Sequence, residues 1–204
     1  MKVKICGITD IQTARAAVQS GADAIGFVFA ESKRKVDIDT AVRISEQVPP
    51  QVLKVGVFVN ETIEKMEEIA EQCHLDFLQL HGDETPEVCK KLRYPIIKAF
   101  GIQSKEDLEE VKKYPVDYVL LDSPKGKYRG GNGITFDWNM LKNTCLPQKV
   151  VVAGGLHEDN VLDMIQKVSP DMVDVSSGVE TDGKKDTVKI QRFIEKVRLS
   201  EESF

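Results

Sequence analysis

The chain has 204 residues, of which 41% are hydrophobic and 30% charged, ordinary values for a soluble globular protein. Its formal net charge is −5, and this acidic balance argues against nucleic acid or an anionic membrane surface as a partner. The sequence contains neither the apolar core of a secretory signal nor a run near the roughly 18 apolar residues of a membrane span. We therefore expect a cytoplasmic protein.

Short apolar runs rich in β-branched residues recur along the whole chain and predict eight strands. They are VKICGI (3–8), AIGFVF (24–29), LKVGVFV (53–59), FLQLHG (77–82), IIKAFGI (96–102), YVLLDS (118–123), VVVAGG (150–155) and MVDVSSGV (172–179). Between them lie segments with helical spacing, at 10–22, 60–74, 104–114, 157–168 and 186–197. Asn60 or Thr62 is the expected cap of the second helix, and Ser104 with Asp107 forms a capping-box pattern in the third.

Strands that alternate with helices over short connections predict right-handed βαβ units and a parallel sheet. Eight such units in a chain of this length favour a closed (β/α)₈ barrel, a single α/β domain that spans residues 1–204. An open, doubly wound sheet is the competing fold. It is less favoured because no Gly-rich dinucleotide fingerprint follows the first strand.

Polar residues interrupt these apolar strands near their C-terminal ends, namely Cys6, Gln79, His81, Asp122 and Asp174. In a barrel, function is built at that end, and residues two apart on a strand share a face. Each residue also has a structural interpretation, since Asp122 can cap a turn, His81 can be a satisfied core histidine and Gln79 can bind loop backbone. Their common position in several strands favours a shared site.

Lys4 shares the face of Cys6 and needs a partner, because a buried ammonium without one is costly. Closure of the barrel makes the eighth strand the neighbour of the first. We therefore predict a structural ion pair between Lys4 and Asp174, which also raises the positive potential near Cys6.

Glycine-rich exits follow the last two strands, AGGL (153–156) and SSGV (176–179). In barrels these two loops commonly bind phosphate through backbone N–H groups, and glycine allows the close approach. The long segment 123–138 lacks a P-loop pattern, so we interpret it as a mobile lid near the substrate.

The four cysteines, Cys6, Cys73, Cys89 and Cys145, are scattered and form no CxxC pair. A disulfide framework or a zinc site is therefore not expected. We interpret the last three as buried or bystander thiols.

Eight segments in order along the chain resemble phosphoribosylanthranilate isomerase, a (β/α)₈ barrel enzyme of tryptophan biosynthesis. They are KICGIT (4–9), GADAIGFVF (21–29), VGVFVN (55–60), LQLHG (78–82), LLDS (120–123), GGNGITFDW (130–138), AGGL (153–156) and VDVSSGVE (173–180). The resemblance implies an Amadori rearrangement of N-(5′-phosphoribosyl)anthranilate to 1-(2-carboxyphenylamino)-1-deoxy-D-ribulose 5-phosphate. It implies a small phosphorylated substrate, no metal and no organic cofactor. We expect a monomer or a homodimer, between which the sequence does not decide.

The resemblance also implies roles for individual residues. Cys6 matches the general base, Asp122 the general acid, and Arg34 the residue that binds the anthranilate carboxylate. The resemblance further implies phosphate contacts for Gly154, Gly155, Ser177 and Gly178. Independently of the resemblance, the late positions of Gln79, His81 and Asp174 in their strands predict further substrate contacts.

The loop that carries Arg34 departs from the family pattern. Family members commonly have a proline before this arginine, whereas this chain reads FVFAESKRKVD, with Lys33 and Lys35 on either side of Arg34. Arg34 is favoured over the two lysines because a planar guanidinium suits bidentate carboxylate binding.

The chemistry sets opposite demands on the two catalytic candidates. A free thiol has a pKa of about 8.5, so Cys6 needs help to ionise, for which Lys4 and the helix that begins near Thr9 are candidates. An ordinary aspartic acid, with a pKa of about 3.9, is ionised at neutral pH, so we expect burial to raise the pKa of Asp122. Such opposed tuning is typical of an acid–base pair.

Two other functions compete. One is another sugar-phosphate barrel isomerase or epimerase. A metal-dependent epimerase wants several His and Asp ligands at strand ends, but of the three histidines only His81 is so placed. A histidine-pathway isomerase wants an aspartate at position 6. The other is a non-catalytic binder of phosphorylated ligands, against which the intact acid and base positions argue.

Overall fold

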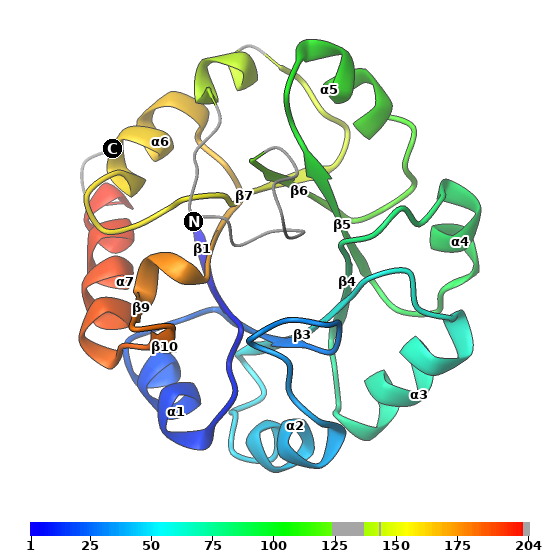
Figure 1. The fold of residues 1–204 in the computed structure, drawn as a ribbon. Coiled ribbons are helices and arrows are strands. Elements are labelled where there is room, and N and C mark those ends of the chain that lie inside the picture. The colour runs from blue at the N-terminus through cyan, green and yellow to red at the C-terminus, as the bar shows by residue number, and fades with distance from the viewer. Residues whose placement is uncertain (124–136, 143, 202–204) are drawn as a thin grey trace.

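The chain forms a closed barrel of eight parallel strands, in a computed structural model that describes residues 1–123, 137–142 and 144–201 (Figure 1). The strands are β1 (Lys2–Cys6), β2 (Ala24–Val28), β3 (Leu53–Phe58), β4 (Phe77–Leu80), β5 (Ile96–Gly101), β6 (Tyr118–Asp122), β7 (Lys149–Val152) and β8 (Met172–Val175). The predicted single-domain barrel is confirmed. Every predicted strand extends past the observed C-terminal end, most of all at β7 and β8, because the glycine-containing exits leave the sheet to form loops.

Helices surround the barrel (Figure 1). They are α1 (Ile11–Gln19), α2 (Ile38–Ser45), α3 (Ile63–Gln72), α4 (Pro86–Lys91), α5 (Lys105–Val111), α6 (Val161–Val168) and α7 (Thr187–Glu201). The five predicted helices are α1, α3, α5, α6 and α7. Thr62 caps α3, and the capping box of Ser104 and Asp107 is present in α5. The helices α2 and α4 were not predicted, although Asp37 and Thr85 cap them in the usual way.

Three short elements complete the described part of the fold. A 3-10 helix η1 (Trp138–Leu141) precedes β7, and a second, η2 (Ser177–Val179), follows β8. A small hairpin of β9 (Glu180–Thr181) and β10 (Lys184–Lys185) then leads into α7. Nearly all of the predicted lid at 123–138 lies outside the described residues.

Two apolar cores lie on opposite sides of the sheet. The outer core lies between strands and helices and includes Ile5, Leu78 and Leu121. The smaller inner core fills the barrel and includes Leu120 and Met172. Side chains alternate along a strand, so residues two positions apart share a face. The inner face therefore carries polar side chains as well as apolar ones. The polar ones are Lys4, Cys6, Gln79, Asp122 and Asp174, as the sequence predicts.

No helix among the described residues is both long and apolar enough to span a membrane.

Candidate active site

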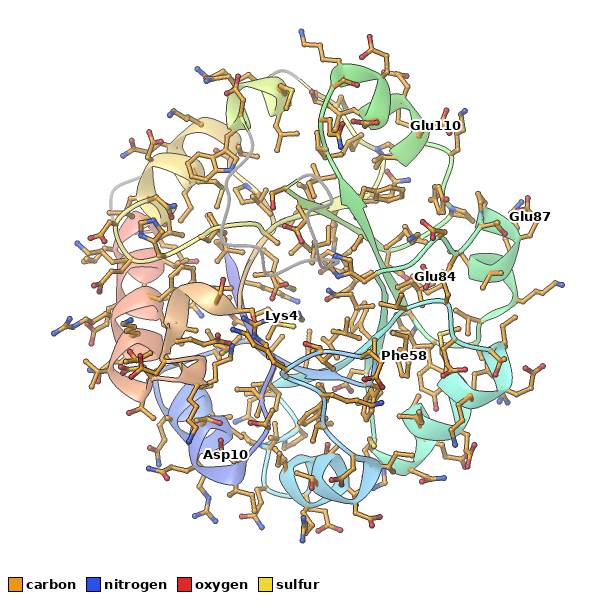
Figure 2. The ribbon with its side chains drawn as sticks, viewed as in Figure 1. Lys4, Asp10, Phe58, Glu84, Glu87 and Glu110 are labelled. Atoms are coloured by element: carbon orange, nitrogen blue, oxygen red, sulfur yellow. The ribbon has the colours of Figure 1, made fainter. Side chains whose placement is uncertain are left out.

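Lys4, which Figure 2 shows inside the barrel, forms a buried ion pair with Asp174 at the inner wall. The two residues are register partners on β1 and β8, and Lys4 Nζ lies 2.9 Å from Asp174 Oδ1. Lys4 is completely buried, and burial disfavours its ammonium. Asp174 and Cys6 together outweigh this effect and raise the pKa of Lys4 above its ordinary value. The predicted pair is therefore confirmed.

Cys6 is the last residue of β1, and its side chain points to the same interior as Lys4. It packs against Gly26 on β2, where an added Cβ would lie 2.9 Å from the sulfur. Burial raises the pKa of the Cys6 thiol; Lys4 and Lys185 lower it, and Asp174 adds to the rise. Lys4 thus acts in the expected direction, but desolvation is the larger effect, so the pKa of Cys6 lies above its ordinary value.

Asp122 ends β6 and is only 4% exposed. Its Oδ1 accepts hydrogen bonds from Ser123 N at 2.7 Å and Ser123 Oγ at 3.2 Å. Its Oδ2 lies 3.5 Å from His81 Nε2. Gly154 lies so close that an added Cβ would be 2.6 Å from Asp122 Oδ1. One carboxylate oxygen therefore caps the strand exit, as in the structural interpretation, while the other faces His81 in the mouth of the barrel.

Gln79 lies on β4, two residues before His81 in the chain, and is 2% exposed. Its register partners are Val57 on β3 and Ile97 on β5. Among the described residues no group donates a hydrogen bond to Gln79 Oε1. This amide oxygen is therefore an acceptor on the inner wall.

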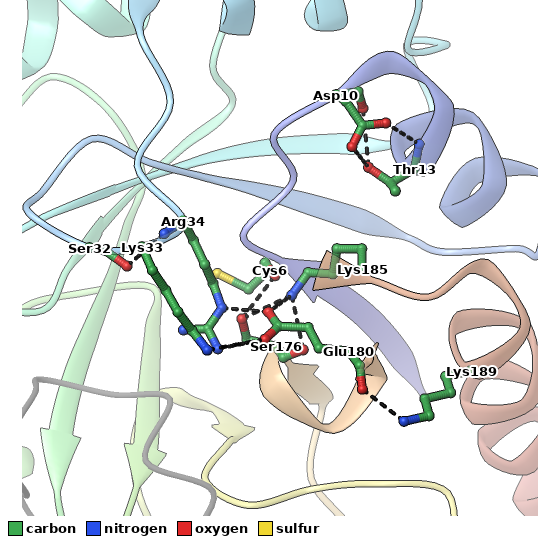
Figure 3. A network of polar contacts seen from close by, with 10 residues as sticks. All are labelled: Cys6, Asp10, Thr13, Ser32, Lys33, Arg34, Ser176, Glu180, Lys185 and Lys189. Carbon is green, nitrogen blue, oxygen red and sulfur yellow. Dashed lines mark hydrogen bonds and ion pairs between the residues drawn. The ribbon is translucent and has the colours of Figure 1, made fainter. Parts of the chain in front are cut away.

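Arg34 lies in the loop after β2 and forms a two-point ion pair with Glu180 (Figure 3). Arg34 Nε donates to Glu180 Oε1 at 2.5 Å, and Arg34 Nη2 donates to Oε2 at 3.0 Å. The Arg34 stem crosses Gly7, which has a φ of +81° and where an added Cβ would meet Arg34 Cδ at 2.6 Å. The side chain of Arg34 is 11% exposed, against 60% for Lys33 and 47% for Lys35, so Arg34 is the most buried of the three cations.

Glu180 and Lys185 were missed by the sequence analysis. The Lys185 ammonium donates to Glu180 Oε1 at 2.8 Å and to Ser176 O at 2.9 Å. Burial opposes the charge on Glu180, but hydrogen bonds from Arg34 and Lys185 outweigh it and lower the pKa of Glu180 to about 2. Lys185 lies in the charged run TDGKKD, whose composition is typical of an exposed turn, so local sequence carried no signal of its burial.

The exits of β7 and β8 lie against each other. Gly154 and Gly155 have φ values of +84° and +62°, which favour glycine. An added Cβ at Gly178 would lie 1.8 Å from the carbonyl oxygen of Leu156. In the described part of the chain the N–H groups of Gly154 and Gly155 have no acceptor. These exits, together with Ser177 at the start of η2, form a glycine-lined corner beside Asp122.

The described residues contain no group of three or more His, Cys, Asp or Glu side chains arranged to hold a metal ion. All four cysteines are free; Cys6, Cys73 and Cys89 are buried and Cys145 is exposed.

Comparison with known proteins identifies the family. The model of the N-(5′-phosphoribosyl)anthranilate (PRA) isomerase family matches residues 3–196. The chain belongs to this family. It is 54% identical over 200 residues to the N-(5′-phosphoribosyl)anthranilate isomerase of Bacillus mycoides (strain KBAB4), an alignment that covers 97% of this chain and 98% of the relative.

Solved isomerase structures share the whole fold. The crystal structure of phosphoribosyl anthranilate isomerase from Thermotoga maritima matches with a TM-score of 0.87 and 43% identity, covering 97% of this chain and 98% of that one. A phosphoribosyl anthranilate isomerase in complex with reduced 1-(o-carboxyphenylamino)-1-deoxyribulose 5-phosphate matches with a TM-score of 0.84 and 41% identity, with the same coverage. The end-to-end likeness agrees with the resemblance found in the sequence.

Proposed function

We propose that this chain is the isomerase of tryptophan biosynthesis that converts N-(5′-phosphoribosyl)anthranilate to 1-(2-carboxyphenylamino)-1-deoxy-D-ribulose 5-phosphate. The observation that carries the proposal is the placement of an acid and a base. Cys6 and Asp122 are the last residues of β1 and β6 and point into one closed barrel from the same end. An aldose-to-ketose rearrangement needs two such groups.

Asp122 is the proposed general acid. In its protonated form it donates a proton to the furanose ring oxygen, and the ring opens to an iminium. The position of Asp122 at the end of β6, with Oδ2 facing His81 in the mouth of the barrel, supports this role. His81, at 3.5 Å from the free carboxylate oxygen, is the neighbour placed to share a hydrogen bond with it.

Cys6 is the proposed general base. As thiolate it removes the proton from C2′ of the iminium, which leaves an enolamine that tautomerises to the ketone. The thiolate is the minor form of this buried group at neutral pH, so the positive charges around it matter for the rate.

Three regions of the mouth are proposed to bind the substrate. Arg34 binds the anthranilate carboxylate, for which its planar guanidinium is suited. Gln79, His81 and Asp174 line the wall near the ribose, where the free Gln79 Oε1 suits a sugar hydroxyl. The phosphate lies on the exits of β7 and β8, with contacts to Gly154, Gly155, Ser177 and Gly178, whose close packing supports backbone binding.

We also propose that residues 1–204 act as one domain in the cytoplasm, as a monomer or homodimer, without nucleic acid or membrane as partner.

Complementation of a tryptophan auxotroph that lacks only this isomerase step tests the proposal. We expect growth without tryptophan from the wild-type chain and none from Cys6→Ser. Absence of growth from soluble, folded wild-type protein would overturn the proposed activity.

A further inference from the structure

Lys185 is a buried cation that no step of the proposed reaction uses. It comes from the β9–β10 hairpin, which lies beside the end of β1 (Figure 3), and its side chain is only 3% exposed. Its ammonium donates to Glu180 Oε1 at 2.8 Å, Ser176 O at 2.9 Å and Ser176 Oγ at 3.1 Å. Burying an ammonium costs free energy. A hairpin with strands of only two residues does not need a buried ammonium to close, so the burial of Lys185 indicates another role.

Ser176 links Lys185 to the backbone of Cys6. The Ser176 hydroxyl donates to the carbonyl oxygen of Cys6 at 3.1 Å and accepts from Lys185 at 3.1 Å. One side chain therefore holds the ammonium at a fixed position relative to the residue that carries the thiol.

With Lys185 present, the charges around the thiol do not balance. The cluster consists of three cations and two carboxylates, namely Lys4, Arg34, Lys185, Asp174 and Glu180. Asp174 neutralises Lys4, while Glu180 is shared by both other cations, so one positive charge is left uncompensated. Lys33 also approaches Glu180, at 3.6 Å, but it is 60% exposed and largely screened by water.

Lys185 and Lys4 are the cations that favour ionisation of Cys6. Burial raises the pKa of the thiol, and these two ammonium groups lower it, whereas Asp174 raises it. Lys4 already has a full counter-charge at 2.9 Å. Glu180 is shared by Lys185 and Arg34, so the excess positive charge arises in this group of three residues. Burial lowers the pKa of Lys185 against the pull of Glu180.

We propose that Lys185, held in place by Glu180 and Ser176, is a positioning residue that supplies the excess positive charge needed to form the Cys6 thiolate. The inference rests on the proposed role of Cys6 as general base. It gives the β9–β10 hairpin an electrostatic part in the reaction, distinct from the proposed role of Arg34 in binding the substrate carboxylate.

The test is the rate at which iodoacetamide alkylates Cys6, resolved by mass spectrometry and followed against pH in a Cys145→Ser background. This rate follows the thiolate fraction and needs no substrate. Cys73 and Cys89, whose pKa values burial raises to about 11, react little near neutral pH. A missing isomerase activity in the wild-type chain would refute the proposed function without affecting this measurement.

Lys185→Gln keeps hydrogen bonding but removes the charge. At pH values below the midpoint of thiol ionisation, it should lower the rate of Cys6 alkylation about tenfold. It should lower kcat at pH 7 by a similar factor with little change in KM, and Lys185→Arg should restore both. The matched control is Lys184→Gln on the same strand, where the side chain is exposed and no effect is expected. If Lys185 only held the mouth of the barrel together, its loss would expose the thiol and alkylation would be unchanged or faster. Either result in Lys185→Gln would overturn the proposal.

Glu180→Gln keeps the proposal testable if Lys185→Gln does not fold. Removing this carboxylate leaves a further positive charge near the thiol, so alkylation of Cys6 should become faster and its midpoint should move to lower pH. A midpoint that stays in place or moves to higher pH would contradict the proposed electrostatic role.

Discussion

Two buried lysine–carboxylate pairs lie on opposite faces of the sheet, and their surroundings differ. Lys4 and Asp174 meet at 2.9 Å inside the barrel, next to Cys6. Lys98 on β5 and Glu84 meet at 3.0 Å on the outer side, where Glu84 lies between the barrel and α4 (Figure 2). Both pairs are nearly inaccessible to water, so both must be satisfied by protein groups.

The outer pair is used to build a loop. Lys98 Nζ donates to the carbonyl oxygens of Leu80 at 3.3 Å and Gly82 at 2.9 Å, and Glu84 Oε2 accepts from Gly82 N at 2.9 Å. These partners flank His81, so the pair fixes the strand exit that brings His81 to Asp122. The inner pair has no such backbone partners among the described residues. The same chemistry therefore supports the backbone on one face and sets the charge beside a thiol on the other.

The largest expected effect is on catalysis, at the inner face. Cys6→Ser and Asp122→Asn should each lower kcat by about 10² to 10⁴, because each removes a proton transfer. Melting curves of both variants should stay near that of the wild type. Near-normal turnover in steady-state assays of either variant would remove that residue from the mechanism.

Lys98→Met breaks the outer pair. Because it leaves the Glu84 carboxylate buried without its counter-ion, we expect the free energy of unfolding to fall by roughly 3–5 kcal/mol in urea titrations. The matched control is Lys167→Met, which removes the half-exposed pair with Asp163 at 2.7 Å and should cost less than about 1 kcal/mol. Equal losses in the two variants would show that the outer pair has no special structural weight.

Arg34→Ala separates binding from chemistry at the mouth. The anthranilate carboxylate is remote from the reacting carbons, so KM should rise about ten- to a hundredfold while kcat changes little. Lys33→Ala, which removes an exposed cation from the same loop, serves as the control and should leave KM nearly unchanged. A fall in kcat alone after Arg34→Ala would contradict the anchoring role.

The ion pairs of Glu180 with Arg34 and Lys185 should make the free energy of unfolding depend on pH in the acid range. The pKa of Glu180 is about 2 in the folded chain, against an ordinary value of 4.5. A lowered folded-state pKa contributes stability that is complete above about pH 4.5 and is lost as the pH falls toward 2. Glu180→Gln should therefore lose less stability than the wild type over this acid range, as measured by urea unfolding. Parallel pH profiles would argue against the ion pairs with Arg34 and Lys185.

The smallest effect is expected from anion binding at the exits of β7 and β8. Inorganic phosphate at tens of millimolar should raise the melting temperature by a few degrees, by linkage. Chloride at equal ionic strength is the control. An equal shift with both salts would count against a phosphate site at Gly154 and Gly178.

The sequence was informative wherever a pattern is local. Alternation along strands correctly placed Lys4 beside Asp174 and Gln79 on the inner wall, because a strand has a period of two and the closed sheet joins β1 to β8. The same reasoning applied to IIKAFGI would have marked Lys98 as a buried cation that needs a partner. Helices α2 and α4 were missed although their caps, Asp37 and Thr85, were visible.

By itself the sequence determined the barrel, its family and the positions of Cys6 and Asp122 at strand ends, because periodicity and motifs are properties of neighbouring residues. Only the tertiary structure decided how the charges around the thiol combine. Glu180 lies 146 residues from Arg34 in the chain, yet it binds both Arg34 and Lys185. Burial of Cys6 raises its pKa against the opposing effects of Lys4 and Lys185. Desolvation and charge pairing depend on which distant groups meet in space, and no local pattern records that.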